Sequence, residues 1–187
     1  MAETQPLDFH SPYGCSKGAA DQYIVDYGRI YGMNTTSFRQ SCIYGPRQFG
    51  VEDQGWVAWF AIAALLDKKL TIYGDGKQVR DVLHVDDLVR AYALAIEQPL
   101  QVRGQAFNIR GGPGETLSLL EPIAMLERRL DKKIAPEFGD WRAGDQKVYI
   151  SDISRLERIL GWRPQIGVQD GVARLIDWVK ENRALFG

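Results

Sequence analysis

Tyr13 and Lys17 lie four residues apart, and a helix that starts at Pro12 places both side chains on one face. A free tyrosine hydroxyl titrates at about pH 10, which is too high for a base at neutral pH. A neighbouring ammonium group favours the phenolate, so a tyrosine beside a lysine forms an acid–base pair. Such a pair can take a proton from a substrate hydroxyl and return it.

The sequence around this pair supports a functional interpretation, although the spacing alone is weak evidence. Proline suits the first turn of a helix. Small side chains, which let a flat ligand approach the helix closely, surround the pair at Gly14, Cys15, Ser16 and Gly18. The alternative is an exposed helix start with unrelated polar residues.

The elements that must position these residues follow from hydrophobic periodicity and turn residues. Helices are predicted over 12–32, from about 54, and over 86–98, 118–130, 152–160 and 168–183, with strands over 35–38, 70–73, 79–85, 106–110 and near 146–150. Asp86 is expected to cap the third helix, and Ser118 with Glu121 is typical of a capping box. The glycine cluster 111–114 is expected to form a turn. This alternation predicts an α/β fold.

Composition excludes several classes of protein. The chain has 187 residues, of which 45% are hydrophobic, and a formal net charge of −1, which favours one ordinary globular unit. The near-neutral charge argues against nucleic-acid binding, and no apolar run reaches the ~20 residues that span a bilayer. Two cysteines favour a reducing cytoplasm over a disulfide framework. His10 and His84 have no partners at metal-ligand spacing, so we expect structural roles for both and no metal site.

Four stretches together resemble the extended short-chain dehydrogenase/reductase enzymes, the NAD-dependent nucleotide-sugar epimerases and dehydratases. In the family's order and spacing, they are residues 11–23, 38–48, 71–87 and 142–145. Within this family, the segment Asp53–Phe60 and Cys42 resemble the CDP-paratose 2-epimerases, or CDP-tyvelose epimerases, most closely.

The resemblance implies the C-terminal part of an extended short-chain dehydrogenase Rossmann fold with its small α/β substrate-binding domain. We expect one unit over 1–187, with residues 11–50 and 84–112 from the Rossmann part and 51–83 and 113–187 from the substrate-binding part. The implied reaction is NAD-dependent oxidation and re-reduction at C2 of a CDP-3,6-dideoxyhexose, which converts CDP-paratose to CDP-tyvelose.

The family's functional residues map onto this sequence one by one. Tyr13 and Lys17 match the catalytic pair. The same two residues with Ser41, Cys42 and Ile43 match the NAD contacts, and the CDP-sugar contacts match Gln48, Trp56, Thr71, Tyr73, Arg80 and Arg142. Arginine suits a diphosphate because its planar fork matches phosphate oxygens.

Several of these residues also have plain structural interpretations. Arg80 can pair with Asp81 or Asp86, and Arg142 can form a surface ion pair. Strand packing alone accounts for Thr71 and Tyr73. The pair Trp56 and Trp59 suits a helical core, and Cys42 suits a buried small side chain.

The glycine-rich turn that holds a dinucleotide pyrophosphate has no match here, and only twelve residues precede Tyr13. We therefore expect the C-terminal half of an epimerase, which is inactive alone or depends on a complementary N-terminal half. This leaves open whether the chain alone binds NAD. A bare strand edge beside 35–38 and the first helix predict a homo-oligomer. The alternatives are a non-catalytic nucleotide-sugar binding or assembly module, and a nucleotide-sugar 4-epimerase or 4,6-dehydratase.

Overall fold

The computed structural model describes residues 1–40, 42–142 and 144–186. Its helices are α1 (Pro12–Tyr31), α2 (Trp56–Leu65), α3 (Val85–Glu97), α4 (Pro99–Val102), α5 (Leu120–Leu130), α6 (Ser154–Leu160), α7 (Val168–Glu181) and the 3-10 helix η1 (Arg183–Phe186). The strands are β1 (Thr36–Gln40), β2 (Ile43–Tyr44), β3 (Thr71–Tyr73), β4 (Val79–Asp81), β5 (Leu83–His84), β6 (Gln105–Ile109), β7 (Thr116–Ser118), β8 (Glu137–Gly139) and β9 (Val148–Tyr149). The predicted α/β class is confirmed.

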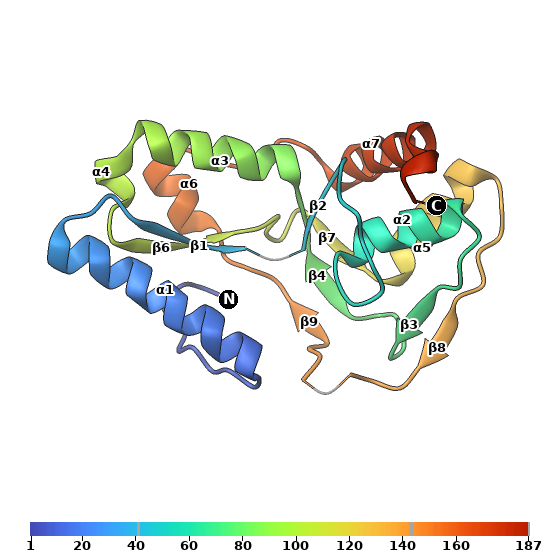
Figure 1. Cartoon of the computed structure of the whole chain (residues 1–187), viewed down its shortest axis with the longest axis horizontal. Helices are drawn as coiled ribbons and strands as arrows, with labels where there is room; N and C mark the ends of the chain where they lie inside the picture. The colour runs from blue at the N-terminus through green and yellow to red at the C-terminus, as the bar shows by residue number, and fades with distance from the viewer. Residues whose placement is uncertain (41, 143, 187) are drawn as a thin grey trace.

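The molecule is elongated and has two ends (Figure 1). At one end, the parallel pair of β1 and β6 lies between α1 on one face and α3 with α6 on the other. At the other end, α2, α5 and α7 pack together beside the short strands β3 and β8. The three-stranded sheet β7–β4–β9 lies between the two ends.

Each end has its own hydrophobic core. The sheet core lies between the pair of β1 and β6 and the helices α3 and α6. Its buried residues include Leu83, Phe107, Leu156 and Trp162. The helix core includes Val57, Phe60, Ile72, Leu126 and Leu175. Helix α2 is apolar on all sides. This explains its position at the centre of the helix core, since a helix without a polar face must be buried.

Helix α1 begins and ends as the sequence predicts. Ser11 is the N-cap and its Oγ accepts a hydrogen bond from the Gly14 N–H at 3.0 Å, while Gly32 ends the helix with a φ of 68°. A Cβ atom on Gly28 would lie 2.4 Å from the Gly104 Cα, so only glycine allows this approach of α1 to the start of β6.

A buried ion pair fixes α1 to β1. The Arg39 guanidinium donates to both carboxylate oxygens of Asp21, at 3.1 and 2.7 Å, and the Ser37 hydroxyl donates to the same group at 2.5 Å. Burial alone would raise the pKa of Asp21, but these hydrogen bonds outweigh it and lower the pKa below its ordinary value.

The prediction of one strand from Val79 to Val85 is wrong. Strand β4 ends at Asp81 and pairs with β7 and β9, whereas β5 pairs with β2, and α3 already begins at Val85. The chain changes sheets at Val82, whose N–H donates to the Glu115 carbonyl at 2.9 Å. A local sequence pattern cannot reveal such a change of partner.

The expected N-cap at Asp86 is also wrong, because the cap is His84. Its Nδ1 accepts a hydrogen bond from the Asp86 N–H at 3.2 Å, so Asp86 lies in the first turn of α3. The capping box before α5 is confirmed: the Ser118 N–H donates to Glu121 at 2.6 Å, and the Glu121 N–H donates to the Ser118 Oγ at 3.4 Å. The expected turn over 111–114 is present as well.

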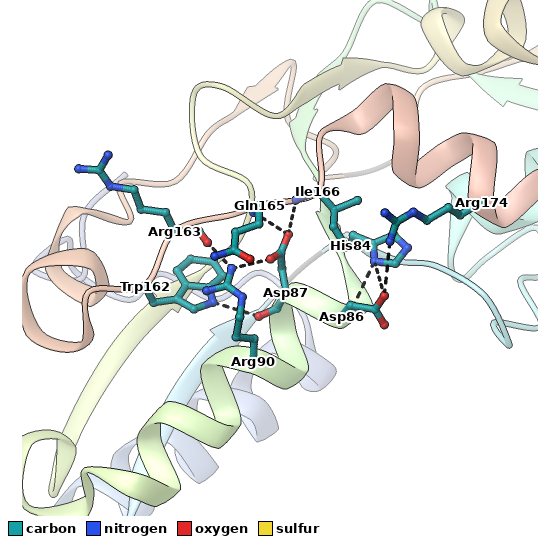
Figure 2. A network of polar contacts seen from close by, with 9 residues as sticks. All are labelled: His84, Asp86, Asp87, Arg90, Trp162, Arg163, Gln165, Ile166 and Arg174. Carbon is teal, nitrogen blue, oxygen red and sulfur yellow. Dashed lines mark hydrogen bonds and ion pairs between the residues drawn. The ribbon is translucent and has the colours of Figure 1, made fainter.

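A buried carboxylate joins α3 to the segment before α7 (Figure 2). Asp87 accepts hydrogen bonds from the Gln165 and Ile166 N–H groups at 3.0 and 2.9 Å, and from Arg90 at 2.5 Å. The Trp162 indole N–H donates to the Asp87 carbonyl at 3.0 Å. Asp87 therefore connects α3, which packs on the sheet core, with the segment that enters the helix core.

Candidate functional site

A cavity of about 370 Å³ opens between β3, β4, the start of α2 and the loop after β8. Six of the residues expected to bind a cofactor or substrate line it: Cys42, Trp56, Thr71, Tyr73, Arg80 and Arg142. They come from segments that lie far apart in the sequence. The fold therefore brings these six residues into one place.

Arg80 points from β4 into this cavity and has one strong partner. Its Nη2 donates to the Asp145 carboxylate at 2.5 Å, and the two side chains are only 15% and 25% exposed. The Gln78 amide also faces Asp145, at 3.5 Å.

The expected alternative partners of Arg80 have other contacts. Asp81 is fully buried and accepts the Gly112 and Ser151 N–H groups, at 3.2 and 3.1 Å. Asp86 lies near His84 and Arg174, at 3.6 and 3.9 Å. Neither carboxylate pairs with Arg80 in the described residues, so this alternative is wrong.

Arg142 also lines the cavity, and its side chain is 40% exposed. Its guanidinium stacks on the Tyr73 ring at 4.0 Å from the centroid and donates to Asp53 at 2.7 Å. The Tyr73 hydroxyl donates in turn to Glu52 at 2.9 Å. Burial by itself would lower the pKa of Arg142, but Tyr73 and Asp53 outweigh it and raise the pKa above its ordinary value. Arg142 therefore remains a cation at any pH of interest.

The walls of the cavity carry both signs of charge. Arg80 and Arg142 face the carboxylates of Glu52, Asp53 and Asp145. Sequence reasoning missed these three acidic residues as part of the site. The segments 53–60 and 142–145 contain two of them, but nothing in the sequence pairs Asp145 with Arg80, because that contact joins positions 65 residues apart.

Trp56 is the first residue of α2 and combines both interpretations that its sequence position allows. It lines the cavity, and its ring packs edge-on against Phe60 at 5.6 Å in the helix core. Trp59 packs against the same core and does not line the cavity.

A second cavity, of about 720 Å³, lies between β2, the loop that follows it and the start of α3. Ile43 and Gln48 line this second cavity. The Gln48 amide nitrogen donates to the Ile43 carbonyl at 3.1 Å, and its buried Oε1 has no hydrogen-bond partner. Gln48, expected beside the substrate, thus lies next to a residue expected to contact NAD, and its amide also lies beside Gly55, which lines the first cavity. Ser41 lies outside the described residues.

Tyr13 and Lys17 adopt the expected arrangement on one face of α1. The Lys17 Nζ lies 5.5 Å from the centre of the Tyr13 ring. The Tyr13 side chain is 73% exposed, and neither residue lines either of the two cavities. The acid–base pair therefore lies on an open surface.

The described residues contain no group of three or more His, Cys, Asp or Glu side chains that could hold a metal ion. Within the same part of the chain, no helix has the length and the apolar character that crossing a membrane requires.

Comparison with known proteins adds independent information. Residues 1–109 match the model of the NAD dependent epimerase/dehydratase family. The chain belongs to this family. CDP-paratose 2-epimerase from Salmonella typhi is 46% identical over 94% of the chain, and a dTDP-glucose 4,6-dehydratase from an Actinoplanes species is 34% identical over 98% of it. The chain spans about half the length of these relatives, 54% and 55%.

Solved structures of family members have the same fold. The UDP-glucose 4-epimerase of Thermotoga maritima, with UDP-glucose, matches 98% of the chain and 58% of its own length with a TM-score of 0.87 and 30% identity. The UDP-glucuronic acid 4-epimerase of Bacillus cereus, in complex with UDP-glucuronic acid and NAD, matches 95% and 54% with a TM-score of 0.82 and 31% identity. The predicted fold class, part of an extended short-chain dehydrogenase fold, is confirmed, and NAD is the cofactor found with structures of this family.

Proposed function

We propose that this chain is the nucleotide-sugar-binding part of an NAD-dependent epimerase that acts at C2 of a CDP-3,6-dideoxyhexose and converts CDP-paratose to CDP-tyvelose. The observation that carries the proposal is that six residues, which the resemblance assigns to cofactor and substrate contacts, line one cavity. The 46% identity to CDP-paratose 2-epimerase favours this substrate over those of the relatives at 32–34% identity.

The two arginines carry the affinity in this proposal. Arg80 and Arg142 both line the cavity, so a diphosphate bound in it would receive donors from both side chains. Thr71 and Tyr73, on β3 beside Arg142, would contact the nucleoside. Trp56 and Cys42 line the same cavity, and the sugar would lie against them.

The acid–base chemistry would belong to Tyr13 and Lys17. A nicotinamide cofactor, when bound, supplies the acceptor and donor of hydride in this family's chemistry. Tyr13 would take the proton of the sugar hydroxyl on its phenol oxygen and return it later, while Lys17 would hold the nicotinamide ribose. Their 5.5 Å contact and the cavity at Ile43 and Gln48 suit this use, although the sequence offers no glycine-rich turn for the pyrophosphate.

A free strand edge bears on how this chemistry would be completed. Among the described strands, β1 pairs only with β6, and α1 exposes Tyr23, Ile30 and Tyr31 at 68–69%. We propose that a second chain covers this region, either a complementary dinucleotide-binding half or another copy. The division into Rossmann residues 11–50 and 84–112 and substrate-binding residues 51–83 and 113–187 belongs to the same proposal. A monodisperse monomer by light scattering at micromolar concentration would argue against the second copy.

The test of the reaction is complementation. The chain is mixed with a separately produced dinucleotide-binding half of the Salmonella typhi relative and with NAD, and the conversion of CDP-paratose is followed by chromatography. We expect turnover that the Tyr13→Phe variant abolishes. The second candidate function is a non-catalytic nucleotide-sugar binding module, which the position of Tyr13 and Lys17 outside both cavities favours. Binding of a CDP-sugar without turnover in the mixture would support that module.

A further inference from the structure

A third cavity, of about 150 Å³, lies at the end of the molecule that contains β1 and β6. Arg155 of α6, Arg39 of β1 and Arg29 of α1 line it, together with the first residues of β6. Cavities that bind drug-sized ligands have volumes of ~300 Å³ or more, so this one suits a small ion better than a nucleotide. It shares no described residue with either of the two cavities above, so it is a separate feature.

Arg155 is a half-buried cation whose printed acceptors carry no charge. Its guanidinium donates to the Ala106 carbonyl at 3.3 Å and to the Gln105 side-chain oxygen at 2.8 Å, and it lies 5.2 Å from the centre of the Phe107 ring. No carboxylate in the described part of the chain forms an ion pair with it. A charge that is partly removed from water is unfavourable unless an opposite charge compensates it. An anion in the cavity would supply this compensation.

Arg39 lines the same cavity and keeps donors to spare. Its guanidinium donates two hydrogen bonds to Asp21 and one to the Glu3 carbonyl. An arginine has five N–H donors, so two of them are left after these three bonds. Arg29 also lines the cavity, but its side chain is 67% exposed and faces Asp26, so mainly water surrounds it. Arg155 and Arg39 are therefore the donors that an anion in this cavity would use.

We propose that this cavity binds a small oxyanion of the phosphate type through Arg155 and Arg39. Guanidinium groups bind phosphate oxygens with charge-assisted hydrogen bonds. The site does not depend on the function proposed above, because none of its described residues is among those expected to contact NAD or the nucleotide sugar. Free phosphate and the phosphate group of a larger molecule share this chemistry.

One carboxylate opposes the anion. Glu3 also lines the cavity, and its Oε1 accepts a hydrogen bond from the Asn108 N–H at 2.8 Å. The negative charge of Glu3 disfavours a second anion beside it. Removing this charge should therefore tighten binding, whereas removing the charge of Arg155 should weaken it.

The experiment is an NMR titration of the isotope-labelled chain with inorganic phosphate at constant ionic strength. The backbone N–H signals of Gln105 and Ala106 report on this cavity, and the signal of Gly144 reports on the cavity at Arg80, which can also attract phosphate. We expect the Gln105 and Ala106 signals of the wild type to shift with a dissociation constant of about 1 mM.

Four variants test the contribution of single charges. Arg155→Gln should weaken binding at Gln105 and Ala106 about tenfold, and Glu3→Gln, which keeps an oxygen acceptor for Asn108, should tighten it about threefold. Arg158→Gln on α6 and Glu181→Gln on α7 make the same charge changes at exposed positions outside the cavity. Both controls should bind within about twofold of the wild type.

The outcomes decide between a built site and a general effect of charge. No shift of the Gln105 and Ala106 signals in the folded wild type would overturn the proposal, and so would equal affinities of Arg155→Gln and Arg158→Gln. Thermal melts check folding, and Glu3→Gln against Glu181→Gln keeps the test decisive if Arg155→Gln does not fold. Phenyl phosphate, a monoester, distinguishes the two sources: tighter binding than inorganic phosphate supports a phosphate group of a larger molecule, and weaker binding supports free phosphate.

Discussion

The two ends of the molecule differ in how complete their functional surfaces are. At the end with α2, α5 and α7, loops and strands line a cavity to which two arginines contribute. At the end with α1, the Tyr13 and Lys17 pair lies on an exposed helix face, beside a strand edge that no described strand covers. Contacts within the chain complete the first surface, so we call this end the closed end. The end with α1 is called the open end.

This difference bears on the function proposed for each end. The proposed nucleotide binding uses the groups that line the cavity, and Tyr73, Asp53 and Asp145 hold its two arginines. Proton transfer needs a substrate held beside Tyr13, and no described residue of the two cavities lies on α1. Binding and chemistry should therefore be separable in this chain by experiment.

The substitution with the largest expected effect should destabilise both ends of the molecule. Asp87→Ala removes the acceptor of two backbone N–H groups and Arg90 in a fully buried position, so it should lower the free energy of unfolding by about 4 kcal/mol. Urea denaturation measures this loss. The control is Asp26→Asn, in an exposed ion pair with Arg29, which should change stability by less than about 0.5 kcal/mol. Equal losses in the two variants would mean that Asp87 does not join the two ends.

A substitution with a smaller expected effect should change only the end that contains the cavity. Arg80→Ala removes a charged donor from the cavity wall and should weaken CDP binding about 100-fold. Calorimetry of the folded variant gives the dissociation constant. Arg29→Ala, on the exposed face of α1, serves as the matched control and should bind CDP like the wild type. A loss of affinity of less than threefold for Arg80→Ala would show that the diphosphate does not bind in the proposed cavity.

The junction between the ends should respond to pH. Burial lowers the pKa of His84 below its ordinary value, against the opposing effect of Asp86, and Tyr44 and Arg174 also lie near its ring. A lowered folded-state pKa means that the unfolded chain binds the proton more readily. Stability is therefore full above about pH 6.5 and falls below it, by at most about 1.4 kcal/mol per pH unit.

Urea denaturation between pH 5 and 8 measures this dependence. The chain contains only one other histidine, His10, whose side chain is 76% exposed. The His10→Gln variant should keep the acid-dependent loss of the wild type, and His84→Gln should be less stable and lack the part of the loss between about pH 6.5 and 5. The same pH profile in both variants would exclude His84 as its source.

The smallest expected effect on CDP affinity gives the sharpest distinction between the two ends. Tyr13→Phe removes one hydroxyl from an exposed position on α1, so CDP affinity should stay within about twofold of the wild type. The same substitution should abolish turnover in the complementation assay. A clear loss of CDP affinity would show that α1 contributes to the nucleotide site and that the two ends do not act separately.

Sequence patterns predicted the long elements well and the short ones poorly. Pro12 and Gly32 mark the limits of α1, and Ser118 with Glu121 marks the start of α5. Strands β2, β7 and β8 contain two or three residues each, which is too few for periodicity to show. The change of sheet at Val82 depends on its hydrogen bond to Glu115, a contact that no local pattern contains.

The candidate site shows the same limit. Motif resemblance named Arg80, Arg142, Thr71 and Tyr73, and all four line one cavity. It also named Gln48, which lines the second cavity and whose amide donates to the Ile43 carbonyl. It also missed the carboxylate partners, because ion pairs between distant segments form only once the fold is complete.

The central claim is that the closed end binds a nucleoside diphosphate without help from a second chain. Calorimetric titration of the purified chain with CDP, and separately with NAD, tests it most directly. We expect micromolar binding of CDP and no measurable binding of NAD. Binding of NAD without CDP would contradict the account, because it would place the working site at the open end beside Tyr13 and Lys17.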